Sequence, residues 1–126
     1  MASKTKLAPI VRGDTLRYKI VVTNPDGKTH PDIGGTLIIF TLKTNATDLD
    51  PGVLQVKYTV PSGITGGINA ANGEAVLTVG STATDALALG SYFYDFQWVI
   101  SSIPPVVTTI QYGMVPVITD ITRSTS

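Results

Sequence analysis

Few residues in this chain have side chains suited to catalysis. The sequence of 126 residues holds one histidine, His30, and no cysteine. A Ser-His-Asp triad would have to use His30 itself, and no G-x-S-x-G elbow accompanies it. A zinc site would need three carboxylates around the same residue. Because His30 lies in a segment rich in Pro, Gly and Asp, we interpret it as a solvated loop residue and predict neither an enzyme nor a cofactor site.

Among the acidic residues, Asp48 and Asp50 are candidates for a metal site, and Asp95 lies within an expected strand. Asp48 and Asp50 have a D-x-D spacing, which could bind Ca²⁺ in a loop of an adhesive module. The further ligands of a calcium loop motif are missing, so Asx-turns in a solvated loop are the favoured interpretation. Asp95 lies within an aromatic segment on the face shared with Phe93 and Gln97. Because an unpaired buried carboxylate is costly, we expect Asp95 to be exposed or bonded to a neighbour.

Two further motifs favour structural roles. Arg12-Gly13-Asp14 is an integrin-binding string, but it directly precedes an expected strand. We therefore predict a bend at Gly13 and a turn role for Asp14. The aromatic row that ends at Trp98 could stack on carbohydrate. At strand spacing the core interpretation is favoured, since a buried Trp is a hallmark of immunoglobulin-like sandwiches.

The elements that must position these residues are strands. Apolar residues recur at every second position, which indicates strands with one buried face. Ser81 or Thr82 could cap a short helical turn over residues 81–89, which Gly90 would end, and we expect a bend or bulge at Gly113. We expect about seven strands, of which the clearest cover residues 15–23, 36–43, 53–60, 74–79, 92–101 and 106–117. The predicted fold is an all-β, immunoglobulin-like antiparallel β-sandwich.

One motif makes the prediction more specific. Residues 89–94 read L-G-x-Y-x-Y. In immunoglobulin-like domains, a tyrosine at the start of the sixth strand packs inward and bonds to upstream backbone. Tyr92 would be that corner tyrosine, and Tyr94 would occupy the position of a cysteine in antibody domains. The residues expected to define the fold are Phe40, Gly90, Tyr92, Tyr94 and Trp98.

Composition limits the partners. Formal net charge is zero, and charged residues make up 14% of the chain, against roughly 25% in a typical domain. A weakly charged surface has little solubility to spare, so we expect part of it to be covered by a partner. No basic stripe favours nucleic acid, and no apolar run approaches a membrane span. We expect an N-terminal arm (1–8), one domain (9–119) and a polar tail (120–126), made in a cytoplasm without a signal peptide.

The motif order resembles the small immunoglobulin-like domains of tailed-bacteriophage structural proteins, and in particular the N-terminal domain of the baseplate upper protein family. The resemblance spans residues 10–123, although members of that family usually continue into a helical or fibre-like extension. It implies a virion protein without catalytic residues, whose partners are other virion proteins and itself, as a homo-oligomer or ring. The motifs that carry it are R-G-D-T (12–15), N-P-D-G-K (24–28), G-T-L-I-I-F (35–40), L-G-S-Y-F-Y-D-F-Q (89–97), T-I-Q-Y-G (109–113) and D-I-T-R (120–123).

Two questions of function stay open at this point. Within a virion, a tail, baseplate or neck subunit competes with a head decoration subunit. Outside it, the aromatic strand and the loop acids would suit an extracellular adhesive or carbohydrate-binding module. In a virion, edge strands and long loops would make the subunit contacts. We expect these contacts in the loops 44–52 and 62–73, the second of which holds the turn signal Asn72-Gly73, and at both termini. The candidate interface residues are Asp48, Asp50, Ile64, Asn69 and Asn72.

Overall fold

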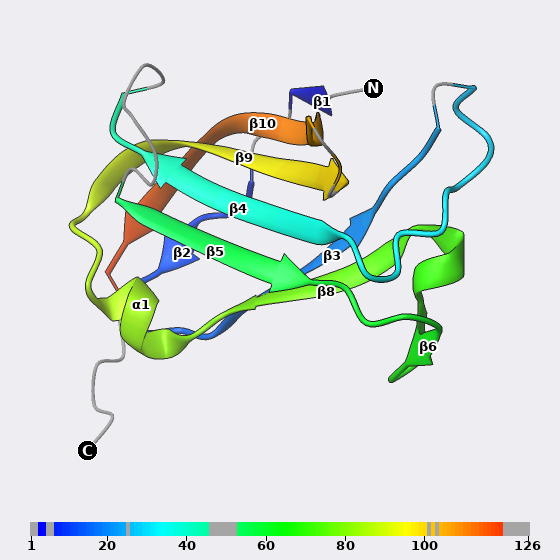
Figure 1. The fold of residues 1–126 in the computed structure, drawn as a ribbon. Helices are drawn as coiled ribbons and strands as arrows, with labels where there is room; N and C mark the ends of the chain where they lie inside the picture. The colour runs from blue at the N-terminus through cyan, green and yellow to red at the C-terminus, as the bar shows by residue number, and fades with distance from the viewer. Residues whose placement is uncertain are drawn as a thin grey trace.

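Two β-sheets pack face to face (Figure 1). The computed structural model describes residues 3–4, 7–24, 26–45, 53–100, 102 and 104–119. The large sheet has the order β1 (Ser3–Lys4), β10 (Val106–Ile118), β9 (Gly90–Ile100), β4 (Leu37–Lys43) and β5 (Leu54–Thr59), and β2 (Ile10–Val11) also pairs with β10. The small sheet consists of β3 (Leu16–Val21) and β8 (Glu74–Val79). The fold is therefore the all-β sandwich that the alternating pattern predicts.

The connectivity is immunoglobulin-like. Strands β10, β9, β4 and β5 correspond to the G, F, C and C′ strands of a variable-type domain, and β3 and β8 correspond to B and E. One detail of the prediction changes: β1 and β2 run parallel to β10, while the other pairs are antiparallel. Ser3–Lys4, expected in an N-terminal arm, thus lies beside the last strand.

The core lies between the sheets and is centred on aromatic rings. Phe40 is fully buried, and its ring centroid lies 4.8 Å from that of Phe96 and 5.3 Å from that of Tyr18. Tyr94 packs edge-on to Phe96 with centroids 5.9 Å apart. Such tilted and offset arrangements add to the free energy gained from burial alone. The inward positions of the expected strands 36–43 and 92–101 therefore lie side by side on the inner face of the large sheet, where Tyr18 of the small sheet packs against them.

The corner before β9 is fixed by a side chain. The Tyr92 hydroxyl donates a 2.6 Å hydrogen bond to the carbonyl oxygen of Ala88, which is the upstream contact expected of a corner tyrosine. Gly90 begins β9 with φ 144°, a backbone conformation that residues with a Cβ rarely adopt. The expected helix end at Gly90 is wrong, because Gly90 opens the strand instead.

The helix itself is shorter than expected. Helix α1 covers Ser81–Asp85, and its N-cap is Gly80, with no side-chain cap hydrogen bond. The predicted caps Ser81 and Thr82 are wrong because both lie inside the helix. After Asp85 the chain turns inward and buries Leu87, which ends the helix before residue 89.

Two further details differ from expectation. The irregularity in β10 falls between Thr109 and Gln111, not at Gly113, which pairs regularly with Tyr94. Residues 62–73, expected as a loop, contain the strands β6 (Ile64–Thr65) and β7 (Ile68–Asn69) and the 3₁₀ turn η1 (Ala70–Asn72). Two-residue strands leave too short an alternation to be recognised in a sequence.

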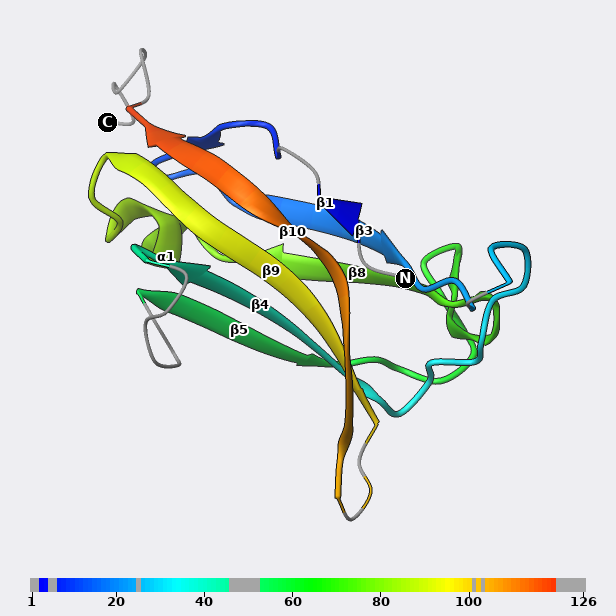
Figure 2. The ribbon, with the colours of Figure 1, turned by 90° about the horizontal axis from the view of Figure 1, so that it is seen from above.

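Several strand edges are open in the described part of the chain. The small sheet has two strands, where a constant-type domain has four. Strand β5 is the last strand of the large sheet, and Figure 2 shows it at the rim of the sandwich. In the same described ranges, no helix is long and apolar enough to cross a membrane.

Candidate docking surfaces

The β6–β7 hairpin carries two of the predicted interface residues. Ile64 pairs directly with Asn69, and the Ile64 side chain is 71% exposed. The Asn69 side chain caps η1 by accepting a hydrogen bond from the Ala71 N–H at 3.1 Å. Asn69 therefore shapes the hairpin, while Ile64 presents apolar surface to solvent.

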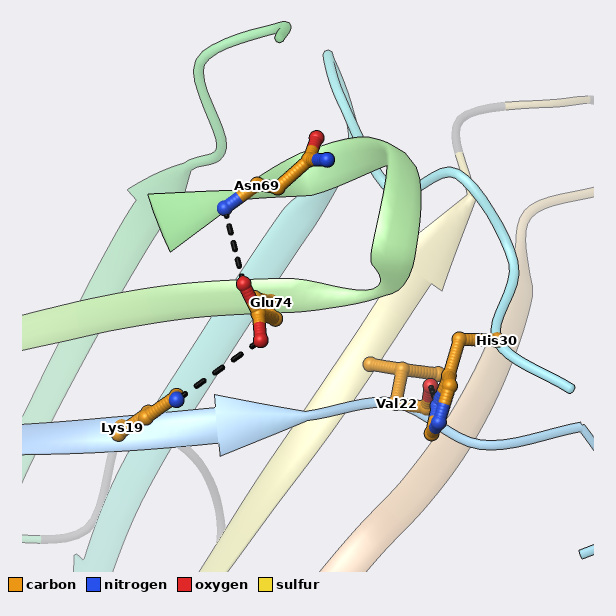
Figure 3. A network of polar contacts seen from close by, with 5 residues as sticks. All are labelled: Lys19, Val22, His30, Asn69 and Glu74. Carbon is orange, nitrogen blue, oxygen red and sulfur yellow. Dashed lines mark hydrogen bonds and ion pairs between the residues drawn. The ribbon is translucent and has the colours of Figure 1, made fainter. Parts of the chain in front are cut away.

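A carboxylate holds this hairpin to the small sheet (Figure 3). Glu74 Oε1 accepts a 3.0 Å hydrogen bond from the main-chain N–H of Asn69. The other oxygen, Oε2, lies 3.8 Å from Lys19 Nζ on the neighbouring strand. The ion pair is partly exposed and contributes little to stability, but the main-chain contact fixes the hairpin. Ile64 is thus carried by a tethered element.

Asn72 and Gly73, the two residues of the expected turn, differ in exposure. Asn72 is exposed in η1, so it is available for contact. Gly73 is buried with φ 74°, and a Cβ at this position would lie 2.5 Å from the carbonyl oxygen of Val22. Only glycine fits this approach. The remaining interface candidates, Asp48 and Asp50, lie outside the described residues.

The outer face of β10 carries an apolar stripe that the sequence analysis missed. Tyr112, Met114 and Ile118 are 43%, 44% and 43% exposed. They are an even number of positions apart, so they share one face of the strand. Met114 lies directly opposite the half-buried Phe93 of β9. We call these four residues the outer stripe. Its signal in the sequence is the run 112–118, which is apolar at even and odd positions alike and therefore predicts a strand covered on both faces.

Asp95 lies on the same outer face. It pairs with Tyr112 of β10 and with Thr41 of β4, and it is half-buried. This position agrees with the face expected from the alternation of β9. The structure thereby places one carboxylate beside the outer stripe.

The long loop between β3 and β4 is held by its own polar groups. Asp26 accepts hydrogen bonds from the N–H groups of Lys28 and Thr29, at 2.8 and 2.9 Å, and from the Thr29 hydroxyl at 2.7 Å. The contacts from Thr29, followed by that from Lys28, lower the pKa of Asp26 to about 2. The loop therefore carries a carboxylate that stays ionised in acid.

His30 belongs to this loop, and its ring points to the backbone of the preceding strand (Figure 3). Its Nδ1 lies 3.0 Å from the carbonyl oxygen of Val22 and donates to it. No described histidine, aspartate and glutamate side chains gather in threes as a metal site requires. The geometry gives His30 a structural contact.

The Arg12-Gly13-Asp14 string is tied to α1 rather than presented in an open loop. The fully buried Thr84 Oγ1 accepts a 3.1 Å hydrogen bond from the Gly13 N–H. The same hydroxyl lies 2.7 Å from the Asp14 carbonyl oxygen. Arg12 donates from Nη2 to the Asp85 carbonyl oxygen at 3.2 Å. The string is therefore a structural turn, although its contacts come from the Arg12 side chain and the main chain of Gly13 and Asp14 rather than from the expected Asp14 side chain.

The aromatic row of β9 faces inward. Trp98 is half-buried against the core, and its indole N–H donates a 2.8 Å hydrogen bond to the Thr36 hydroxyl. Tyr92, Tyr94 and Phe96 are buried. The row is therefore occupied by packing and does not form an exposed stacking platform.

Two hollows lie at the open sides of the sandwich. One, of about 140 Å³, is lined by Tyr58 of β5, by Val60 just after that strand, and by Ala75 and Val76 of β8. The other, of about 100 Å³, lies between β3 and β10. Small-molecule sites usually have volumes of about 300–1,000 Å³. These hollows are therefore better suited to single side chains of a docked segment.

The comparisons with known proteins give no family. No family model matches the chain, and a search of the curated proteins finds no match. The fold and the exposed surfaces are therefore the observations on which a function must be argued.

Proposed function

We propose that this chain is a non-enzymatic structural subunit of a tailed-bacteriophage particle, acting by docking to other subunits and to itself. The outer stripe is the observation that carries the proposal. Three large apolar side chains, Tyr112, Met114 and Ile118, are exposed on one strand, in a chain with few charges. Contiguous exposed apolar surface marks interaction sites in proteins.

The motif order supports the setting of the proposal. Two of the segments that resemble the immunoglobulin-like domains of phage structural proteins have structural roles here. Residues 12–15 tie the first turn to α1, and residues 89–97 form the corner and the aromatic strand. In such a fold the core supplies stability, and edges and loops remain for assembly.

Within the particle, a tail, baseplate or neck position is the first proposal and a head decoration position is the alternative. A subunit with one exposed stripe and open strand edges suits a symmetric ring, in which each copy covers a surface of the next. The copy number separates the two positions, because decoration needs hundreds of copies, whereas a neck or baseplate ring needs few.

The carbohydrate-binding alternative is less well supported. This alternative requires an exposed aromatic row for stacking on carbohydrate. The residues of the row pack inward instead: Tyr92, Tyr94, Phe96 and Trp98. The loop acids that would also suit it, Asp48 and Asp50, lie outside the described residues. No described surface therefore favours this alternative over docking between subunits.

The proposal is tested with particles made from the genome that encodes the chain. The double variant Tyr112→Lys/Met114→Lys places charge in the outer stripe. The control, Thr78→Lys, places charge at an exposed position of the small sheet. We expect both variants to fold with the wild-type circular dichroism spectrum, and only the double variant to be lost from purified particles. Equal incorporation of the two variants would count against docking through the stripe.

A further inference from the structure

Strand β5 ends the large sheet with an open edge. It pairs with β4 on one side, and no described strand pairs with its other side. Figure 2 shows β5 outermost, beyond β4. An edge of this kind presents unpaired donors and acceptors that another strand can match.

A hydrogen bond just after β5 fixes which of its residues face outward. The Val60 N–H donates to the Thr36 carbonyl oxygen of the strand entrance at 2.8 Å. The pair of Thr36 and Val60 continues the register in which Ile38 lies opposite Tyr58. Main-chain groups alternate in direction along a strand, so even-numbered residues of β5 bond to β4. The N–H and C=O groups of Gln55, Lys57 and Thr59 therefore point away from the sheet.

The other open edges are less suited to pairing. The start of β8 is occupied by the β6–β7 hairpin, through the contact between Asn69 and Glu74. Strand β3 presents two exposed cations, Arg17 and Lys19, at alternate positions along its free side. Strand β5 carries a single charge, Lys57, in its six residues. Among the described strands, β5 therefore combines a side without a strand partner with a single charge.

We propose that the β5 edge pairs antiparallel with β5 of a second copy of this chain, with Val56 of one copy opposite Val56 of the other. Paired residues point to the same face, so Leu54 then lies opposite Tyr58 and extends the apolar inner face. On the outer face Gln55 lies opposite Lys57. A pairing centred on Lys57 would instead place two ammonium groups opposite each other, which is destabilising.

The register also matches the hydrogen bonds available. Gln55 of one copy and Lys57 of the other form a hydrogen-bonded pair that exchanges both N–H···O=C bonds, and the two-fold axis repeats this pair. Val56 meets its counterpart in a non-hydrogen-bonded pair, where Cα atoms approach to about 4.5 Å. The contact is closed by symmetry, so it produces a dimer and leaves no β5 edge open. This inference deepens the proposed docking function and rests on it for its setting in a particle.

The register is tested by cross-linking, because the wild-type chain has no cysteine. In the Val56→Cys variant, the two cysteines lie opposite each other at the two-fold axis. Their Cα atoms are about 4.5 Å apart in a non-hydrogen-bonded pair, which is within the separation of about 4.4–6.8 Å that a disulfide needs. We expect a covalent dimer on mild oxidation. In the control, Thr59→Cys, the two positions lie several residues apart in this register, and we expect no dimer. Equal cross-linking of both variants, or none in Val56→Cys, would overturn the register.

The edge itself is tested by sedimentation at increasing concentration. Gln55→Lys places lysine opposite Lys57 twice per dimer, and we expect the dissociation constant to rise about tenfold. Lys57→Pro removes an outward N–H while leaving the β4–β5 ladder intact, and we expect it to be monomeric. The control Gln97→Lys makes the same substitution as Gln55→Lys, but on β9, a central strand of the same sheet. We expect it to dimerise like wild type.

Each outcome decides the inference separately from the function. Wild-type chain that stays monomeric up to about 1 mM overturns the inference. Loss of dimer in Gln97→Lys but not in Gln55→Lys also overturns it, because the sheet face would then be the contact. If the dimer forms as proposed but the chain is absent from particles, the inference stands and the proposed function fails.

Discussion

The Tyr92 hydroxyl and the carbonyl oxygen of Ala88 lie 2.6 Å apart across the corner that leads from α1 into β9. Tyr92 is buried at the start of the central aromatic strand. The hydrogen bond therefore fixes where β9 enters the large sheet. Because β9 pairs with both β4 and β10, this corner positions the core and the outer stripe together.

Removing this hydrogen bond should weaken the fold without changing it. In Tyr92→Phe the ring stays and the donor is lost, so the free energy of unfolding should fall by about 1 kcal/mol. Urea denaturation measures the change. Tyr112→Phe, which removes a hydroxyl at an exposed position, is the control and should change stability little. Equal losses in the two variants would contradict the role given to the corner.

Thr84 links the first turn to α1. In Thr84→Val the Gly13 N–H loses its 3.1 Å acceptor, the hydroxyl of a buried side chain. Gly13 itself is exposed, so the expected loss is that of one hydrogen bond, about 0.5–1.5 kcal/mol, and the melting temperature should fall accordingly. Thr78→Val makes the same change at an exposed strand position and should be neutral. If both variants melt alike, the turn does not depend on Thr84.

The strands could be predicted because their inner faces alternate. The Glu74–Val79 strand begins and ends where the pattern indicates, and the L-G-x-Y-x-Y motif identified the corner. The pairing of β1 and β2 with β10 could not be predicted, because each has two residues. The predicted helix cap at Ser81 or Thr82 is wrong because the residue before the first turn is Gly80, which has no hydroxyl side chain.

The surfaces were predicted less completely than the core. Exposure at Ile64 and Asn72 followed from turn signals, and both are exposed. The hydrogen bond from the Asn69 N–H to Glu74, which holds the hairpin that carries Ile64, could not be predicted. The two groups come together only in the folded chain. The open edge of β5 depends on the order of strands in the sheet, which alternation alone does not fix. Asp48 and Asp50 stay predictions.

Tyr18 should make stability depend on alkaline pH. Burial, and to a smaller extent the charge of Tyr94, raises its pKa from 10.0 to about 12. Since the native state keeps the proton longer than the unfolded state, its stabilising contribution is complete below pH 10 and is lost as pH rises through about 12. Urea unfolding between about pH 8 and pH 12 should show a shallower decline in Tyr18→Phe than in wild type.

Tyr112→Phe is the control for this titration and should keep the wild-type decline. The decline in Tyr18→Phe should not vanish completely, because burial also raises the pKa of Tyr94. Identical pH profiles for wild type and Tyr18→Phe would show that Tyr18 does not titrate as its buried position requires.

Asp26 should make stability depend on acidic pH. Its pKa is lowered from 3.8 to about 2, first by the Thr29 N–H and then by the Thr29 hydroxyl and the Lys28 N–H. The stabilising contribution is therefore present above pH 3.8 and is lost as pH falls through about 2. An NMR titration of the Asp26 carboxyl carbon should give a midpoint near 2 in wild type, and Thr29→Val should move it upward. A wild-type midpoint at 3.8 would contradict the loop geometry.

The proposed function is tested most directly by quantitative mass spectrometry of intact particles purified from cells in which the genome that encodes the chain is expressed. The account predicts the chain in the particle at a fixed ratio to the other structural proteins, and its loss when the outer stripe carries Tyr112→Lys/Met114→Lys. A chain that is abundant in the lysate but absent from purified particles would contradict the account.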